Sequence, residues 1–130
     1  PPEYDVDGEY TVRGGASAMA ELLSLPEPPT AVFAQSDEMA AGAMQVMRRM
    51  GVQVPDDISI VGFDDHELAE VLDLTTMAQP VAQRGELAVH AVLDALAAGH
   101  HHTPAERELV HTRLVVRSST APFENREQTR

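Results

Sequence analysis

The 130-residue chain contains no cysteine, no tryptophan and no lysine. The absence of cysteine excludes disulfide bonds and thiolate metal sites. The sequence has no apolar run of membrane-spanning length and no basic start followed by an apolar stretch. It therefore predicts neither a membrane span nor a signal peptide, and we expect a cytoplasmic protein with no membrane contact.

The charge of the chain excludes DNA as a direct partner. The formal net charge is −12, and all nine basic residues are arginines. DNA binding requires a basic surface that neutralises phosphates, so this chain is expected to be repelled by DNA. Its hydrophobic content of 43% is typical of a globular protein, and its length is that of one domain or part of one.

Short β-branched segments alternate with helical segments along the chain, and this order predicts an α/β fold with a parallel sheet. Loops are expected at 8–13 and 100–106, and a polar tail from 122 to 130. Strands are expected at 4–6, 30–34, 58–63, 75–78 and 108–116, and helices at 14–25, 37–50, 67–72 and 81–98.

Two adjacent carboxylates follow the strand expected at 58–63. Ligands bind outside the carboxyl ends of the strands in open parallel sheets. A carboxylate there can accept two hydrogen bonds from neighbouring hydroxyls, as sugar recognition requires. Asp64 is therefore the leading candidate for ligand contact, and the alternative is that it caps the turn through local backbone groups. Asp65 is expected to support the loop instead.

Four sequence blocks together resemble the lactose/galactose repressor (LacI/GalR) family of bacterial transcription regulators. They occur in family order and at family spacing, within a match that spans residues 8 to 120. They read PTAVFAQSDEMAAGA at 29–43, VPDDISIVGFDD at 54–65, LTTMAQP at 74–80 and LVVRSST at 114–120.

The resemblance implies a fold and an organisation. The chain is expected to be a partial effector-binding domain of the type I periplasmic-binding-protein-like class, a two-lobed parallel-sheet α/β sandwich. Residues 1–130 would form mostly the C-terminal lobe, whereas helix 81–98 belongs to the N-terminal lobe in the family. The helix-turn-helix domain that binds DNA is absent, so we interpret the chain as a fragment.

The resemblance also implies four effector-binding residues. Asp64 would bond effector hydroxyls, and Tyr10 would stack on a sugar ring unless it is a surface tyrosine. Ser36 stands where many members have Asn, and it serves equally well as a helix N-cap. Gln79 lies at a crossing between lobes, where it would bond a ligand or satisfy hinge backbone groups. Asp37 is expected to be structural.

The methionines of helix 37–50 recur at helical spacing, which by itself indicates core packing. The resemblance adds a homodimer interface formed by this helix and the short helix that follows residue 66. Small alanines would allow close approach of helices there. The residues expected at the interface are Ala40, Ala41, Met44, Met47, Leu68, Val71 and Leu72.

No catalytic motif stands out in the sequence. It has no nucleophile elbow, no glycine-rich phosphate loop and no His-Glu-x-x-His motif, so we expect no enzyme and no cofactor. The run from His100 to His102 cannot present three ligands to one metal from a regular element, and we expect no metal site. The rival interpretation is a periplasmic sugar-binding protein of an uptake transporter, which shares the two-lobed fold.

Helix 81–98 carries an apolar face whose family partner, the N-terminal lobe, is not in the sequence. Burial of each such side chain is worth about 1.5–3 kcal/mol. We therefore expect this face to pack onto another chain or to fold back on the sheet of this one. It comprises Leu87, Val92, Leu93 and Leu96.

Overall fold

A computed structural model describes residues 1–98 and 109–122 of the chain. The described residues form two units. The first unit combines residues 1–78 with the chain from Leu114 onward, and the second runs from Gln79 to Arg113. Each unit is described by itself.

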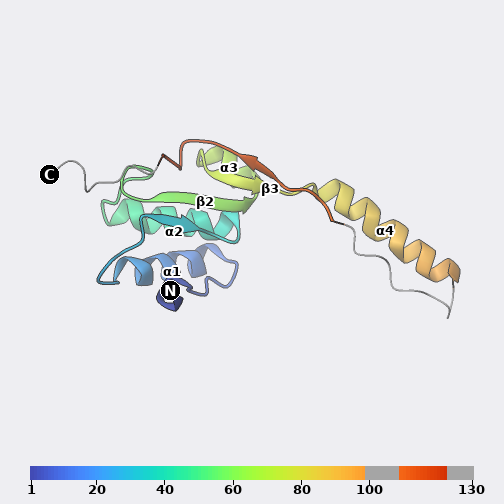
Figure 1. Cartoon of the computed structure of the whole chain (residues 1–130), viewed down its shortest axis with the longest axis horizontal. Coiled ribbons are helices and arrows are strands. Elements are labelled where there is room, and N and C mark those ends of the chain that lie inside the picture. Colours follow the sequence, from blue (N-terminus) through green and yellow to red (C-terminus); the bar gives the residue numbers. More distant parts are fainter. Residues whose placement is uncertain (99–108, 123–130) are drawn as a thin grey trace. The chain divides into compact units, whose positions relative to one another are not determined.

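The first unit is built on a four-stranded sheet with the order β1-β2-β3-β4 (Figure 1). β1 pairs with β2 and β2 pairs with β3, both in parallel. The α/β fold class with a parallel sheet is therefore confirmed. The elements are η1 (Pro2–Tyr4), α1 (Val12–Leu23), β1 (Ala31–Phe33), α2 (Asp37–Arg49), β2 (Ser59–Asp64), α3 (Glu67–Val71), β3 (Thr75–Ala78), α4 (Val81–Ala98) and β4 (Arg113–Val115).

The strand expected at 4–6 is wrong, because a short 3-10 helix occupies Pro2–Tyr4. The amide of Tyr4 donates to Pro1 O at 3.2 Å, and that of Asp5 donates to Pro2 O at 3.1 Å. Proline fixes φ near the helical value, and its missing N–H costs nothing in a first helical turn. Two consecutive prolines therefore favour a turn over a strand at this end.

The caps of the helices follow the local sequence. The hydroxyl of Thr11 accepts from Gly14 N at 2.9 Å, so α1 begins at Val12, two residues before the predicted start. α2 ends at Arg49, one residue before the predicted end, and Gly51 follows with φ +79°. That left-handed conformation is one that glycine adopts without steric cost.

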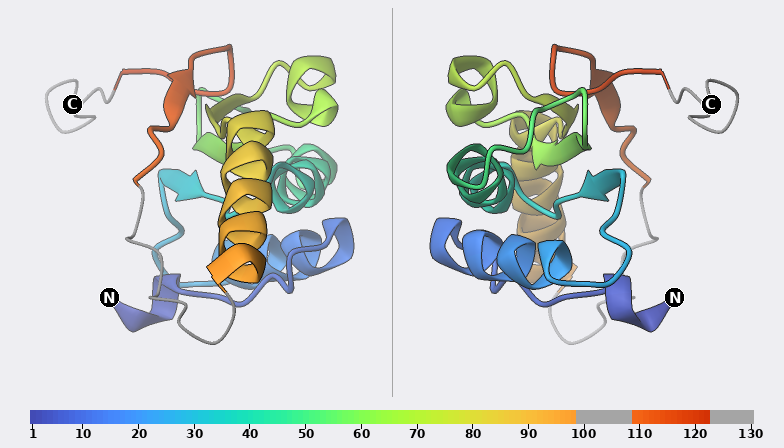
Figure 2. Two further views of the ribbon diagram at one scale, coloured as in Figure 1. Left: turned by 90° about the vertical axis from the view of Figure 1, so that its right-hand side faces the viewer. Right: turned by 90° about the vertical axis from the view of Figure 1, so that its left-hand side faces the viewer.

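The core is formed by the sheet and by the helices α1 and α2, which pack closely against each other and cross at an angle (Figure 2). Glycine permits their close approach, because a Cβ on Gly15 would lie 2.2 Å from Met39 O, and one on Gly42 would lie 1.9 Å from Val12 O. The most buried large side chains of this core are Met19, Met47, Ile60 and Leu74.

The last strand is shorter than the sequence predicted. β4 spans only Arg113–Val115, whereas residues 109–112 are in no strand. The chain that follows is held by side-chain bonds, because the hydroxyl of Ser119 donates to Ile60 O at 2.6 Å and accepts from Thr75 N at 2.8 Å. Polar side chains thus replace part of the expected backbone pairing. The predicted loop at 100–106 and Glu108 lie outside the described residues.

The second unit contains α4, whose predicted bounds are confirmed. Three of its apolar side chains, Val92, Leu93 and Leu96, are 58%, 57% and 74% exposed. The expectation that this face packs onto another chain or folds back on the sheet of this one stays a prediction.

Candidate functional site

The candidate site lies at the carboxyl ends of β1 and β2. Phe33 of β1 is paired in register with Val61 of β2. Ser36 and Asp64 each follow three residues later, so both lie at the carboxyl ends of neighbouring parallel strands. This edge of an open parallel sheet is where ligands bind. The geometry thus brings together two of the four predicted effector contacts.

The backbone at Asp64 and Asp65 is in a conformation that favours glycine. Their φ angles are +111° and +60°. Non-glycine residues in this region cost about 1–3 kcal/mol, and such strain concentrates at functional sites. Both side chains are half-buried. The turn therefore holds Asp64 at the edge of the sheet in an arrangement that local sequence preference would not select.

Asp65 has the structural role predicted for it. Arg117 Nη2 lies 2.9 Å from Asp65 Oδ1, and Arg117 Nη1 donates to Leu74 O at 2.8 Å. One guanidinium thus joins the turn after β2 to the segment that precedes β3. Because Arg presents several donors in a planar fork, it can make both bonds at once. The prediction that Asp65 supports the loop is confirmed.

Asp37 is fully buried beneath the same turn. Its Oδ2 accepts from His66 N at 2.7 Å, and its Oδ1 accepts from Thr76 Oγ1 at 2.6 Å. Burial is the main cause that raises the pKa of Asp37 above its ordinary value. The two hydrogen bonds lower it, and the charges of Asp64 and Asp65 raise it further. The expected structural role of Asp37 is confirmed.

The position of the buried Asp37 carboxylate leaves no room for a side chain at Gly62. A Cβ at Gly62 would lie 2.3 Å from Asp37 Oδ1 and 2.9 Å from Leu74 Cδ2. A side chain there would force Asp37 out of its position. The glycine of the strand thus admits the carboxylate that ties α2 to β3 and to the turn after β2.

Ser36 is 4% exposed, and its hydroxyl accepts from Met39 N at 3.2 Å. The N-cap role predicted for Ser36 is therefore confirmed. Its contact with an effector stays a prediction. A hydroxyl has one donor and two acceptor sites, so the cap leaves its O–H available for a second partner.

Tyr10 lies next to a residue that the sequence interpretation missed. Its hydroxyl donates to Gln35 Oε1 at 2.6 Å, and its side chain is 65% exposed. Gln35 directly follows Ala34 at the end of the β1 segment, so it borders the same edge of the sheet. Gln35 could have been identified from the sequence, because it stands immediately before Ser36 in the block at 29–43.

Gln79 belongs to the second unit, where it follows β3 and precedes α4. Its carbonyl oxygen accepts from Val81 N at 2.9 Å, and its side-chain Oε1 accepts from Arg84 Nη1. These bonds support the first turn of α4. The printed side-chain bond of Gln79 goes to another side chain rather than to a backbone group, so both expected roles of its amide, effector contact and satisfaction of hinge backbone groups, stay predictions.

Two of the residues expected at a dimer interface are buried inside this chain and cannot contact a partner. Ala40 and Met47 are 0% exposed within the core of this chain. Val71 is 78% exposed, and Ala41, Met44, Leu68 and Leu72 are partly exposed. The predicted interface is therefore narrowed to these five residues of α2, α3 and the adjoining turn.

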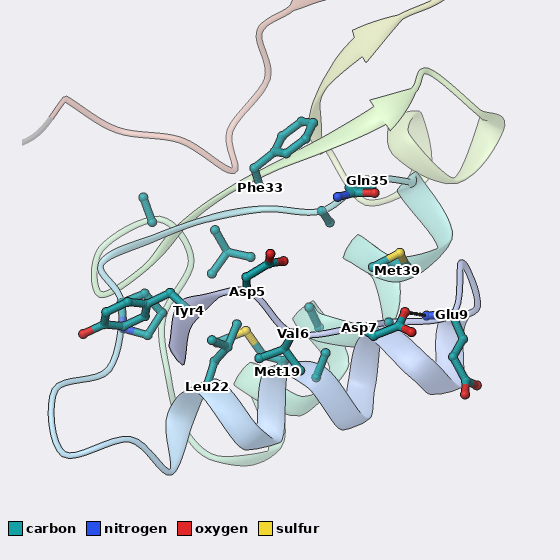
Figure 3. Close-up of a pocket in the computed structure, with 18 of the residues that line it drawn as sticks. Tyr4, Asp5, Val6, Asp7, Glu9, Met19, Leu22, Phe33, Gln35 and Met39 are labelled. Carbon is teal, nitrogen blue, oxygen red and sulfur yellow. Dashed lines mark hydrogen bonds between the residues drawn. The ribbon is translucent and has the colours of Figure 1, made fainter. Parts of the chain in front are cut away.

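A groove of about 780 Å³ lies beside β1 (Figure 3). It runs between the N-terminal segment 4–10, the helix α1 and the segment 29–35 that contains β1. Tyr10 and Gln35 border it, whereas Asp64 does not line it. The groove therefore shares Tyr10 and Gln35 with the proposed effector contacts but does not include the carboxylate turn.

Residues 1–98 and 109–122 contain no group of three or more His, Cys, Asp or Glu residues placed to hold a metal ion. None of their helices is long and apolar enough to cross a lipid bilayer.

A parallel α/β sheet with polar side chains at the carboxyl ends of its strands is the architecture of the open α/β class, in which ligands bind at that edge. The chain belongs to the periplasmic binding protein-like domain family, whose model matches residues 1–120. It is 42% identical over 121 residues to the HTH-type transcriptional repressor CytR of Escherichia coli K12, covering 92% of this chain and 35% of the relative. It is 41% identical over 119 residues to the probable HTH-type repressor ExuR of Bacillus subtilis, covering 90% and 35%.

Solved structures agree with these relatives. A LacI transcriptional regulator from a Rhodococcus species is 37% identical with a TM-score of 0.77, covering 86% of this chain and 41% of that one. A LacI-family regulator from Enterococcus faecium with bound ribose is 32% identical with a TM-score of 0.75, covering 88% and 42%. The resemblance to the lactose/galactose repressor family is confirmed, and the chain is homologous to a fragment of their effector-binding domain. It spans about a third of the length of the curated relatives it matches.

Proposed function

We propose that the chain is the effector-sensing and dimer-forming part of a LacI-type transcriptional repressor, and that the effector is a sugar or a sugar derivative. The observation that carries the proposal is the strained turn that holds Asp64, like Ser36, at the carboxyl edge of the sheet. The repressor relatives and the ribose bound to one structural neighbour favour the same class of ligand.

Each side chain of the site has a chemical role in this proposal. Asp64 accepts hydrogen bonds from two neighbouring hydroxyls of the sugar. The exposed ring of Tyr10 covers the apolar C–H face of the sugar, and its bond to Gln35 fixes its direction. Asp37 and Arg117 hold the turn in place, so the site is organised before the ligand arrives.

The remaining assignments extend beyond this chain. In the proposal, α4 and the segment before it belong to the second lobe, and Gln79 lies at the crossing between lobes. Sugar binding shifts the equilibrium between lobe arrangements, because the ligand has different affinities for them. DNA is bound only by a separate N-terminal domain, since this chain carries a net charge of −12.

The same proposal makes the protein a cytoplasmic homodimer with no catalytic role and no cofactor. The rival function, a sugar-binding protein of an uptake transporter, shares the two-lobed fold. The relatives reported above are transcriptional repressors, which favours the regulator. A DNA-binding domain encoded before residue 1 would support the regulator, and a signal peptide there would support the transporter.

Titration of the ¹⁵N-labelled chain with D-ribose, followed by NMR, tests the effector site. Because this chain supplies one wall of the cleft, we expect weak binding, with Kd above about 1 mM, the scale of about −4 kcal/mol. Amide shifts should centre on Gln35, Asp64 and Asp65. Asp64→Ala should abolish them, whereas the exposed control Glu21→Ala on α1 should leave them unchanged.

Shifts centred on Met19 and Leu22 at the apolar side of the groove, or on α4, would contradict the assignment of the site. Sub-micromolar affinity in calorimetry would contradict the view that the chain holds only one wall of the cleft. Absence of any shift with D-ribose and with a panel of pentoses and hexoses up to their solubility limit would contradict the sugar class.

A further inference from the structure

The carboxyl group of Asp37 is held between α2, β2 and β3 without access to solvent. Its exposed fraction is 0%, and so is that of Thr76, whose hydroxyl it bonds. On the side of β2 the carboxyl group fills the space that a side chain would take, because a Cβ at Gly62 would lie 2.3 Å from Asp37 Oδ1. An ionised carboxylate is costly to bury, so a group in this position gains from taking up a proton.

The two hydrogen-bond partners of this carboxyl group respond differently to a proton. His66 N, 2.7 Å from Oδ2, is a backbone donor and can only donate. Thr76 Oγ1, 2.6 Å from Oδ1, belongs to a hydroxyl, which can donate to a carboxylate or accept from a carboxylic acid. A proton on Oδ1 of Asp37 therefore keeps both contacts, with the direction of the Thr76 bond reversed. The surroundings of Asp37 thus accommodate both of its protonation states.

The charges that act on Asp37 come from the turn that carries the proposed effector contact. After burial and the two hydrogen bonds, the carboxylates of Asp64 and Asp65 are the further causes that shift the pKa of Asp37, and both raise it. The guanidinium of Arg117 is engaged by Asp65 at 2.9 Å. The protonation of Asp37 is therefore sensitive to events at the turn.

Two other titratable side chains adjoin Asp37. Glu38 follows it in the first turn of α2. His66 bonds Asp37 through its backbone N–H, whereas its imidazole Nδ1 accepts from Leu68 N at 3.4 Å and caps α3. The imidazole is thus directed to α3, and both side chains serve as controls for the source of a proton.

A ligand bound to Asp64 would change the surroundings of Asp37 by covering the turn. Asp64 and Asp65 are half-buried, so water reaches them and screens their charges. A ligand displaces this water, and charges interact more strongly where the dielectric constant is lower. Repulsion between the turn and an ionised Asp37 then increases, whereas a protonated Asp37 is neutral and is not repelled. Binding of the ligand and protonation of Asp37 therefore favour each other.

We propose that Asp37 is a proton-linked positioning residue of the effector site, which takes up a proton when the ligand covers the turn, so that the effector binds more tightly as the pH falls. This inference rests on the proposed function, because it requires the effector at Asp64. Coupling between two sites is reciprocal, so the proton favours the ligand by the same factor by which the ligand favours the proton.

The sign of the pH dependence follows from this linkage. In the complex the pKa of Asp37 is higher than in the free chain, so binding is accompanied by proton uptake between the two values. The affinity for the ligand begins to rise as the pH falls through the pKa of Asp37 in the complex. It becomes constant below the pKa of Asp37 in the free chain.

The test follows the ¹³C resonance of the Asp37 side-chain carboxyl by NMR in the intact 130-residue chain, assigned through the bonds to its own backbone. The resonance is titrated with pH in the absence and presence of saturating D-ribose, and the sugar should move the midpoint to higher pH. The Kd of D-ribose, from the amide shifts of Asp64 and Asp65, should fall about fivefold between pH 7 and pH 5, the lower end of typical coupling between two sites.

Two variants separate proton uptake from a merely structural role of Asp37. Asparagine places an oxygen and an NH₂ group where the neutral acid has its oxygen and its O–H. Asp37→Asn should therefore bind D-ribose at every pH with the affinity that the parent reaches only at low pH. Thr76→Val removes a hydrogen bond that lowers the pKa of Asp37, so its affinity should begin to rise at higher pH than that of the parent.

Glu38→Gln and His66→Asn are the matched controls. Each removes a titratable side chain that adjoins Asp37, and asparagine is a good cap for α3. His66→Asn also keeps the backbone N–H that bonds Asp37. Both variants should retain the pH profile of the parent. Loss of the pH dependence in either one would assign the proton to that side chain and overturn the role of Asp37.

A midpoint of the Asp37 carboxyl that stays constant or falls on addition of D-ribose would overturn the proposal. If D-ribose still shifts the amides of Asp64 and Asp65, the effector site stands and only the proton linkage fails. If neither D-ribose nor a panel of pentoses and hexoses shifts any amide, the effector site and the proton linkage fail together. The carboxyl titration uses the unaltered chain, so it decides the question even if Asp37→Asn does not fold.

Discussion

Thr76 and Asp37 lie 39 residues apart in the sequence, and the hydroxyl of Thr76 donates a 2.6 Å hydrogen bond to the buried Oδ1 of Asp37. The other oxygen of this carboxylate accepts from His66 N. One buried group therefore connects the start of α2, the strand β3 and the turn that presents Asp64. This arrangement places a buried, hydrogen-bonded carboxyl group directly beneath the candidate effector site.

Loss of the Thr76 hydroxyl should destabilise the chain. Thr76→Val keeps the shape of the side chain but leaves Asp37 Oδ1 buried without a donor. An unsatisfied buried acceptor costs about 1–3 kcal/mol, and more when it is charged. Urea unfolding followed by circular dichroism measures the change. Thr76→Ser retains the donor, so its free energy of unfolding should fall clearly less. Equal decreases in both variants would contradict the role of the hydrogen bond.

Asp37 should make the stability of the chain depend on pH in a recognisable direction. Its pKa is raised in the folded state, so the folded chain binds a proton there more readily than the unfolded chain does. Proton binding to Asp37 therefore stabilises the folded chain. This stabilisation is fully present below the ordinary pKa of 3.8 and is lost as the pH rises through the raised pKa.

Comparison with Asp37→Asn isolates this contribution, because the variant cannot titrate at that position. The stability of the parent relative to the variant should increase as the pH is lowered from 7 toward 4. Unfolding free energies from urea titrations at several pH values give the difference. A difference that stays constant over this range would show that the pKa of Asp37 is not raised.

Addition of one methyl group at Gly62 should be costly, since it would meet Asp37 Oδ1 at 2.3 Å. Overpacking of this kind costs about 1–3 kcal/mol. Gly85 is the matched control, because a Cβ there meets nothing within 4 Å and the residue lies inside α4. Gly85→Ala should stabilise its helix by about 0.5–1 kcal/mol. Thermal unfolding should show a lower melting temperature for Gly62→Ala and a higher one for Gly85→Ala than for the parent chain.

The proposed homodimer should depend on Val71, whose side chain is 78% exposed at the end of α3. Val71→Asp places a charge on this apolar surface and should convert a dimer into a monomer in light scattering. It is a cleaner test than Leu72→Asp, because Leu72 also packs against the core of its own chain. Val116→Asp, at another exposed position, should leave the mass unchanged. A parent chain that is already monomeric at high concentration would contradict the interface.

Much of the fold was predictable from local sequence because its signals act within a turn of chain. Ser36 followed by two acids marks the start of α2, and Arg48 and Arg49 before Gly51 mark its end. Caps, helix dipoles and glycine conformations depend on neighbours three or four residues away. The same logic failed at the start of the chain, where a strand was expected at 4–6 but two prolines favour the 3-10 turn at Pro2–Tyr4.

The sequence by itself determined the order of strands and helices, the caps, the acidic surface and the family. It also placed Asp64 after a buried strand, and hence at an edge that binds ligands. Only the tertiary structure decided which distant groups meet. Tyr10 bonds Gln35, Asp65 pairs with Arg117, and Ala40 is buried in the core rather than offered to a partner. The physical reason is that such contacts are set by packing of whole elements, whose relative positions no local pattern of residues encodes.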